Sequence, residues 1–343
     1  MAFTFPLFLL FLSLAASALT PSFSQRRPHQ PPPQQLYPDY YRRSCPSFNW
    51  IMEDKTTKKQ IESPTTAAAA LRLSFHDCFV GGCDASILVS STHSNRAERD
   101  ADINLSLPGD GFDVVVRAKT ALELACPGVV SCADILAVAT RNLVVQTGGP
   151  YYTVLLGRRD GLVSSAAHVE GNLPRPTMPM AQIIEIFRSR NFSIQEMVAL
   201  TGAHTIGFSH CKEFSSNIYL HSGPTRSDPS YNPQFAEQLR NACANYTRDP
   251  TLSVANDVMT PGRFDNVYYQ NLPRGLGLLS SDHALHSDPR TRPFVELYGR
   301  NQTAFFEAFG RAMEKLSAYG AKTGRDGEIR RRCDAFNNPA AMV

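Results

Sequence analysis

The sequence predicts an all-α fold, and three observations carry this prediction. Apolar residues recur with helical spacing in several segments, capping residues stand at the ends of these segments, and few stretches alternate with a period of two. Residues 113–126 show the pattern well, because Val114, Ala118 and Leu122 share one side of a helix and Pro127-Gly128 would end it. The chain is therefore expected to build its core from packed helices.

Two further helices are expected in the first half of the chain. Ser63 is predicted to be an N-cap with Pro64 at the first helical position, opening an apolar helix that runs through residues 70–78. Ser131 is predicted to cap another helix, which stops at Gly148-Gly149.

The second half continues the pattern. Ser193 and Glu196 form a capping box for a helix that ends near Gly202. Residues 302–319 place phenylalanines and other apolar residues on one side. Residues 152–156 are the exception, because they fit a short strand.

The N-terminus reads as a targeting segment followed by a linker. Residues 1–24 carry no Lys, Arg, Asp or Glu, and their apolar run is too short to span a bilayer comfortably, which favours a cleaved secretory signal over a membrane anchor. Cleavage after Ala18 or Ser24 is expected. Residues 25–35 contain three consecutive prolines among polar residues, so we expect a flexible, solvated arm.

Charge and cysteine usage narrow the class of protein. A net charge of +3 over 343 residues implies no nucleic-acid partner, and any attraction to an acidic polysaccharide would be weak and salt-sensitive. All 8 cysteines follow the signal, and an even count in a secreted chain predicts four disulfides, of which spacing alone favours only Cys78–Cys83. Zinc is the alternative, but no C-x2-C pair occurs.

The most informative stretch is A-L-R-L-S-F-H-D-C-F-V-G-G-C-D-A-S, residues 70–86. Arg72 and His76 are four residues apart, so a helix places them on one face, with Phe75 beside them as a bulky wall. A neutral His can accept a proton, and an Arg one turn away can stabilise developing negative charge. This pair suits heterolytic cleavage of a peroxide O–O bond, which also needs an electron source such as haem iron.

A second stretch, M-V-A-L-T-G-A-H-T-I-G, contains a histidine that could bind such an iron. His204 lies just past the expected helix end at Gly202 and is a candidate metal ligand. Together the two stretches resemble the distal and proximal signatures of the plant secretory (class III) haem peroxidases. The resemblance covers residues 36–337, leaving 338–343 as a short tail.

This resemblance implies the haem peroxidase fold, in which a distal and a proximal helical domain sandwich one haem b. It implies that His204 binds the iron, that Asp282 accepts the other His204 N–H, and that Asn104 fixes the tautomer of His76 with support from Glu98. The carbonyl of Pro174, in N-L-P-R-P, would help to bind reducing phenols. The chain departs from the family pattern at Asp110, where Arg is common, within an inserted Pro108-Gly109-Asp110.

The resemblance also implies two Ca²⁺ sites, one beside each histidine, built from hard oxygen ligands. The first calcium cluster would be Asp77, Val80, Gly82, Asp84 and Ser86. The second calcium cluster would be Thr205, Asp257, Thr260, Arg263 and Asp265. The remaining disulfides implied by the resemblance are Cys45–Cys126, Cys132–Cys333 and Cys211–Cys243.

The favoured function is therefore a secreted haem peroxidase that reduces H2O2 to water while oxidising phenolic donors in one-electron steps. Two alternatives remain: a non-catalytic calcium-binding glycoprotein on the same scaffold, and a haem oxygen carrier or sensor. Glycosylation sequons stand at Asn191, Asn245 and Asn301, whereas a buried catalytic role would leave the sequon at Asn104 unglycosylated. We expect a monomer in the extracellular space or cell wall, with no membrane partner.

Overall fold

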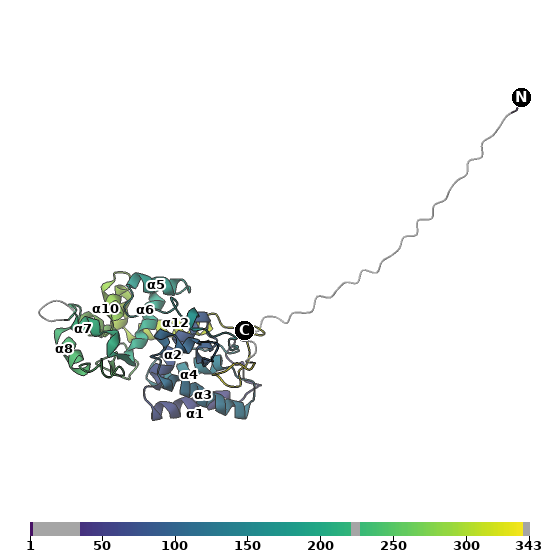
Figure 1. The fold of residues 1–343 in the computed structure, drawn as a ribbon, viewed down its shortest axis with the longest axis horizontal. Helices are drawn as coiled ribbons and strands as arrows, with labels where there is room; N and C mark the ends of the chain where they lie inside the picture. Colours follow the sequence, from purple (N-terminus) through teal and green to yellow (C-terminus); the bar gives the residue numbers. More distant parts are fainter. Residues whose placement is uncertain (3–34, 221–226, 339–343) are drawn as a thin grey trace. The chain divides into compact units, whose positions relative to one another are not determined.

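The computed structural model describes residues 1–2, 35–220 and 227–338, and these are mainly helical (Figure 1). Apart from Met1, Ala2 and Gln35, the expected signal and arm lie outside the described residues, as do residues 339–343 of the tail. The described helices are α1 (Phe48–Glu62), α2 (Thr66–Gly81), α3 (Gly109–Ala125), α4 (Cys132–Gln146), α5 (Met180–Arg188), α6 (Ile194–Thr201), α7 (Ser215–Tyr219), α8 (Pro233–Ala242), α9 (Val267–Asn271), α10 (Ser280–Ser287), α11 (Arg292–Arg300) and α12 (Gln302–Ala318). The predicted all-α class is confirmed.

Two groups of helices position the site. In the first group α2 packs on α3 and α4, and α1 packs on the same two helices. In the second group α12 packs on α6 and α11, and α11 packs on α9. Contacts between α12 and α2 join the groups, so a C-terminal helix lies against the helix that carries Arg72 and His76 (Figure 1).

The apolar side chains follow this arrangement. One continuous core runs through both groups and includes fully buried Met52, Phe79 and Phe305. A smaller cluster surrounds α7 and α8, with Phe214 and Leu239 at its centre. Burying this apolar area supplies the main stabilisation of the fold.

Four disulfides tie these elements together. They join Cys45 to Cys126, Cys78 to Cys83, Cys132 to Cys333 and Cys211 to Cys243, the same pairing that the resemblance implies. The bridge between Cys132 and Cys333 closes a loop with a sequence separation of 201. On a chain-entropy account, closing a loop this long stabilises the fold by about 5 kcal/mol.

The predicted start of the α2 helix is wrong. The helix begins at Thr66 rather than at Pro64, and Ser63 ends α1 instead of capping α2. The turn between the two helices is only three residues long, so Pro64 lies inside it. The Ser63 hydroxyl donates to a carboxylate of α3, at 2.9 Å from Asp110 Oδ2.

The inserted Pro108-Gly109-Asp110 forms the start of a helix, because Gly109 and Asp110 are the first two residues of α3. Pro108 stands at the N-cap, and α3 starts four residues earlier than the predicted Asp113. A carboxylate in the first helical turn is favourable because it faces the positive end of the helix dipole. Asp110 also accepts bonds from Lys59 Nζ at 2.7 Å and Thr65 Oγ1 at 2.7 Å, which ties α3 to α1 and to the turn before α2.

The predicted strand at residues 152–156 is wrong as well. Leu156 forms only an isolated bridge with Tyr37. The two described strands lie elsewhere, at β1 (Phe208–His210) and β2 (Ser253–Ala255), which pair antiparallel. Elements of three residues are too short for a period of two to be visible in the sequence.

Candidate active site

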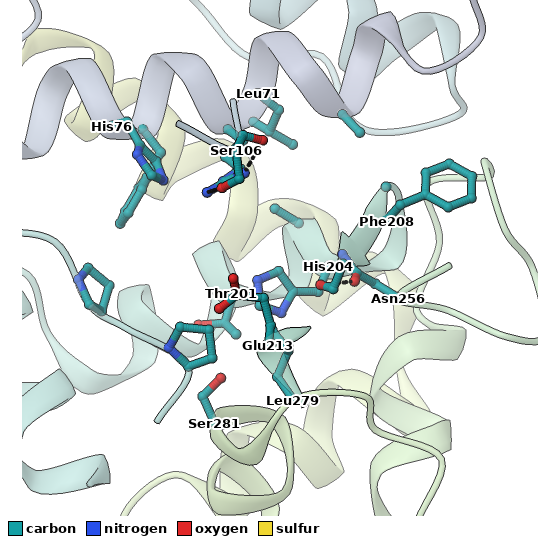
Figure 2. Close-up of a pocket in the computed structure, with 18 of the residues that line it drawn as sticks. Leu71, His76, Ser106, Thr201, His204, Phe208, Glu213, Asn256, Leu279 and Ser281 are labelled. Atoms are coloured by element: carbon teal, nitrogen blue, oxygen red, sulfur yellow. Dashed lines mark hydrogen bonds between the residues drawn. The ribbon is translucent and has the colours of Figure 1, made fainter. Parts of the chain in front are cut away.

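One large cavity lies between the two groups of helices. Its volume is about 750 Å³, and both Arg72 and His76 of α2 line it together with His204. Figure 2 shows His76 and His204 on opposite walls, with the open space between them. The four-residue spacing of Arg72 and His76 therefore places both side chains on the cavity face of α2, as predicted.

His76 is held as a neutral imidazole. Its Nδ1 lies 2.6 Å from Asn104 Oδ1, and Asn104 Nδ2 donates to the Glu98 carbonyl at 2.7 Å. Because that donation turns the amide oxygen toward the imidazole, Nδ1 must carry the hydrogen and Nε2 keeps its lone pair. Burial and, second, the charge of Arg72 lower the pKa of His76 to about 3, against the opposing effect of Asn104.

Glu98 reaches Asn104 through its backbone and not through its carboxylate. Glu98 supports Asn104 through its backbone carbonyl, while its carboxylate accepts a bond from Ser86 Oγ at 2.8 Å. Asn104 is only 2% exposed, so its sequon leaves no room for a glycan in the folded chain.

The Arg72 guanidinium is oriented by the chain that follows Asn104. It donates to the Ser106 carbonyl at 2.9 Å, to Ser106 Oγ at 2.9 Å and to the Ile103 carbonyl at 3.3 Å. Burial lowers the pKa of Arg72, and the nearby Glu213 carboxylate opposes this. Nothing in the sequence singled out Ser106 or Glu213, because their link to Arg72 exists only in the folded chain.

Phe75 forms part of the cavity wall beside His76. Its ring lies edge-on to the imidazole at 6.1 Å and packs on Phe79 at 4.2 Å and on Phe187 of α5 at 5.9 Å. Pro174 lines the cavity too, together with Arg175 and Pro176.

His204 stands on the opposite wall, in the short 3₁₀ turn Gly202–Thr205 that follows α6. The predicted capping box of α6 is confirmed, and the helix ends at Thr201 as expected. Gly202 has an ordinary φ of −57°, so it is needed for space rather than for a left-handed turn. A Cβ there would lie 2.3 Å from the Tyr269 hydroxyl.

Asp282 holds the far side of the His204 ring. His204 Nδ1 lies 2.9 Å from Asp282 Oδ1, and the carboxylate also caps α10 by accepting the Leu279 N–H at 2.9 Å. A third donor was not predicted: Tyr268 Oη donates to Oδ1 at 2.7 Å. Burial acts to raise the pKa of Asp282, but the interactions with His204 and the other donors outweigh it, so the pKa is lowered.

The first calcium cluster contains two buried carboxylates, Asp77 and Asp84, and of these only Asp84 forms an ion pair with a described residue. Asp77 accepts the N–H groups of Ala85 and Ile87, and Asp84 contacts both the Ser86 N–H and Lys322 Nζ. Burial, followed by the charges of Asp84 and Glu98, raises the pKa of Asp77 well above its usual range. Val80 and Gly82 lie at the C-terminal end of α2, beside this group.

The second calcium cluster lies next to His204. Thr260 Oγ1 is 3.3 Å from Asp257 Oδ2 and 3.1 Å from Asp265 Oδ1. Thr205 Oγ1 is 3.3 Å from the Arg263 carbonyl and accepts the Asp265 N–H at the same distance. The five expected ligands are therefore brought together by segments more than 50 residues apart.

Oxygen atoms dominate both clusters. Within the part of the chain that the structure describes, no three His, Cys, Asp or Glu side chains group closely enough to hold a metal ion by themselves. An ion in either cluster would therefore depend on hydroxyl and carbonyl oxygens as well, which is the ligand mixture that Ca²⁺ accepts.

Comparison with known proteins agrees with this geometry. The family model "Peroxidase" matches residues 52–301. The chain is 64% identical to Peroxidase 63 of Arabidopsis thaliana over 299 residues, covering 87% of this chain and 90% of that relative. It is 61% identical to Peroxidase 31 of the same plant over 303 residues, covering 88% of this chain and 94% of that relative.

The chain therefore belongs to the peroxidase family and is a haem peroxidase. The expectation drawn from its two histidine stretches is confirmed at the level of family, fold and enzyme class. The comparisons give no support to the non-catalytic alternative. In the described residues no helix has the length and hydropathy needed to cross a bilayer.

Proposed function

We propose that one haem b lies in the cavity between His76 and His204, with His204 Nε2 as the ligand of its iron. The observation that carries this proposal is the matched pair of histidines on opposite walls. In each, Nδ1 is held by an oxygen acceptor, and among the described residues neither Nε2 has a hydrogen-bond partner. The largely apolar wall, with Phe75 and Phe309, fits a flat hydrophobic cofactor.

Haem, when bound, supplies the redox-active iron that the reduction of H2O2 requires. His76 Nε2 then accepts a proton from the peroxide and delivers it to the departing oxygen. Arg72 stabilises the negative charge that develops on that oxygen. Asn104 keeps Nδ1 protonated, so that Nε2 is the basic atom throughout.

The electron donors are small phenols, oxidised one electron at a time at the cavity edge near Pro174. Supporting this, Pro174 lies on the lining of the same cavity as the two histidines. Arg175 follows it with its side chain 38% exposed, so the edge is reached from solvent.

Two Ca²⁺ ions complete the site, one in each calcium cluster. The burial of three carboxylates, Asp77, Asp84 and Glu98, supports the first ion, because among the described residues only Asp84 of the three has an ion-pair partner, Lys322, and buried carboxylates need nearby positive charge. The converging oxygens of Asp257, Thr260 and Asp265 support the second. Each ion would tie a loop to the segment that carries a catalytic histidine.

The signal segment and the disulfides both fit a secreted enzyme. We assign residues 1–24 to a signal segment, 25–35 to an arm, 36–337 to the peroxidase domain and 338–343 to a tail. Four disulfides with no free cysteine among the described residues suit an oxidising compartment such as the extracellular space or cell wall. The protein would act there as a monomeric glycoprotein, with at most weak polysaccharide contact.

One experiment tests this function directly. The purified full chain is titrated with haem, its visible spectrum is recorded, and one equivalent of H2O2 is added. We expect a haem band at a 1:1 ratio that shifts on adding peroxide and returns when a phenol follows. A protein that takes up no haem, or whose haem band does not respond to peroxide, would contradict the proposal.

A further inference from the structure

The carboxylate behind His204 receives two side-chain donors on one oxygen. Asp282 Oδ1 lies 2.9 Å from His204 Nδ1 and 2.7 Å from the Tyr268 hydroxyl, while Oδ2 accepts the Leu279 N–H at 2.9 Å. A carboxylate oxygen has two lone pairs, so His204 and Tyr268 fill both of those on Oδ1. The two donors therefore compete for the electron density of the same atom.

We propose that Tyr268 is a positioning residue that tunes the iron held by His204, by drawing on the Asp282 oxygen that accepts the His204 proton. A free carboxylate would pull strongly on that proton and give the imidazole partial imidazolate character. The Tyr268 hydrogen bond weakens this pull, and so weakens electron donation from His204 to iron. The inference rests on the proposed role of His204 as the iron ligand.

The surroundings give Tyr268 little freedom to release Asp282. Tyr268 is 1% exposed and Asp282 is fully buried, so water does not replace either partner. The Tyr268 ring stands edge-on to His204 at 5.9 Å and to Tyr269 at 5.1 Å. A hydrogen bond held in such a low-dielectric place acts on its acceptor more strongly than one in water.

The adjacent tyrosine provides a matched control. Tyr269 is equally buried, but its hydroxyl donates to the Val198 carbonyl at 2.7 Å. Tyr268→Phe and Tyr269→Phe thus each remove one buried hydroxyl from neighbouring positions of α9, and only the first removes a donor from Asp282.

The test compares the haem-loaded full chain with both variants. The readouts are the Fe(III)/Fe(II) reduction potential and the iron–histidine stretching frequency of the ferrous protein. Tyr268→Phe should lower the potential and raise the stretching frequency, because the His204 imidazole becomes a stronger donor. Tyr269→Phe should leave both readouts at their wild-type values, although both variants lose some thermal stability.

A second variant at position 268 should shift the reduction potential in the opposite direction without changing how the side chain packs. Tyr268→3-fluorotyrosine retains the shape of the side chain but carries a more acidic hydroxyl, which donates more strongly. It should raise the potential, as should Asp282→Asn, which removes the carboxylate charge. The 3-fluorotyrosine variant also tests the inference if Tyr268→Phe does not fold.

Equal potentials in wild type, Tyr268→Phe and Tyr268→3-fluorotyrosine would overturn the inference, as would shifts of the same sign in the two Tyr268 variants. Loss of haem from the wild-type chain, or an iron–histidine band unaffected by His204→Ala, would instead contradict the proposed function. The two failures are therefore distinguishable.

Discussion

His76 Nδ1 lies 2.6 Å from Asn104 Oδ1, and Asn104 Nδ2 is itself bound to the Glu98 carbonyl. This chain fixes one tautomer of a buried imidazole. The ring nitrogen that faces the cavity is thus left with a lone pair, which is the condition for a base that receives a proton from peroxide.

The first prediction concerns pH. Burial and the charge of Arg72 lower the pKa of His76 from 6.5 to about 3, so the neutral base should persist in moderately acidic solution. We expect the rate constant for reaction with H2O2, measured by stopped-flow absorbance, to stay level from neutral pH downward and to fall only as the pH approaches about 3. An acid limb centred near the ordinary histidine pKa would show that the base is not held in this way.

The same shift affects stability with a defined sign. Between pH 3 and 6.5 the unfolded state binds a proton at His76 that the folded state does not. The contribution of His76 to the free energy of unfolding therefore rises as the pH increases through this window and is constant above it. Chemical denaturation at several pH values, compared between wild type and His76→Gln, measures this contribution; a pH-independent difference between the two would contradict it.

The second prediction separates proton transfer from haem binding. His76→Ala should retain a haem spectrum but react with H2O2 about 10²–10⁴-fold more slowly, the usual contribution of a general base. His168→Ala is the matched control, because His168 is exposed and lies outside the cavity lining. A variant at His76 with a near-normal rate would remove this residue from the mechanism.

The third prediction concerns Arg72. Arg72→Leu should keep haem bound while slowing the reaction with H2O2 by about 10²–10³-fold, as expected for loss of a group that stabilises developing charge. Ser106→Ala should have a smaller effect, since the carbonyls of Ser106 and Ile103 still orient the guanidinium. Stopped-flow rates for the two variants give the comparison, and the reverse order of effects would be inconsistent with this role for Arg72.

Much of this site is predictable from the sequence, for physical reasons. Arg72 and His76 sit on one helix, where four-residue spacing fixes a common face, and His204 follows a helix with a clear capping box. Ser106 and Tyr268, by contrast, could not be predicted as site residues. Their partners, Arg72 and Asp282, are reached only through tertiary folding, so no local pattern marks them.

The secondary structure likewise contains elements that the sequence predicts and elements that depend on tertiary contacts. Long helices with a strong apolar face, such as α12, begin and end close to their predicted bounds. The start of α2 is misplaced because Ser63 bonds to Asp110 across the fold, and the three-residue strands β1 and β2 depend on each other rather than on local preference. Tertiary contacts override local propensity at such short elements.

The fourth prediction concerns calcium. Exhaustive chelation should release two ions and lower the thermal midpoint and the activity together, because ligand loss destabilises only the folded state. Thr260→Val should weaken one site by removing the hydroxyl between Asp257 and Asp265, whereas Thr251→Val, at an exposed turn, should not. Metal analysis and calorimetry provide the readout. Equal metal content in both variants would rule out Thr260 as a ligand.

The central claim is that the two histidines have opposite roles on opposite walls of one cavity, and axial ligation of the iron tests it most directly. Resonance Raman spectra of the ferrous haem protein are recorded for wild type, His76→Ala and His204→Ala. The iron–histidine band should be present in wild type, unchanged in His76→Ala, and lost in His204→Ala until imidazole is added. Loss of the band in His76→Ala with an unaltered band in His204→Ala would show that the two assignments are reversed.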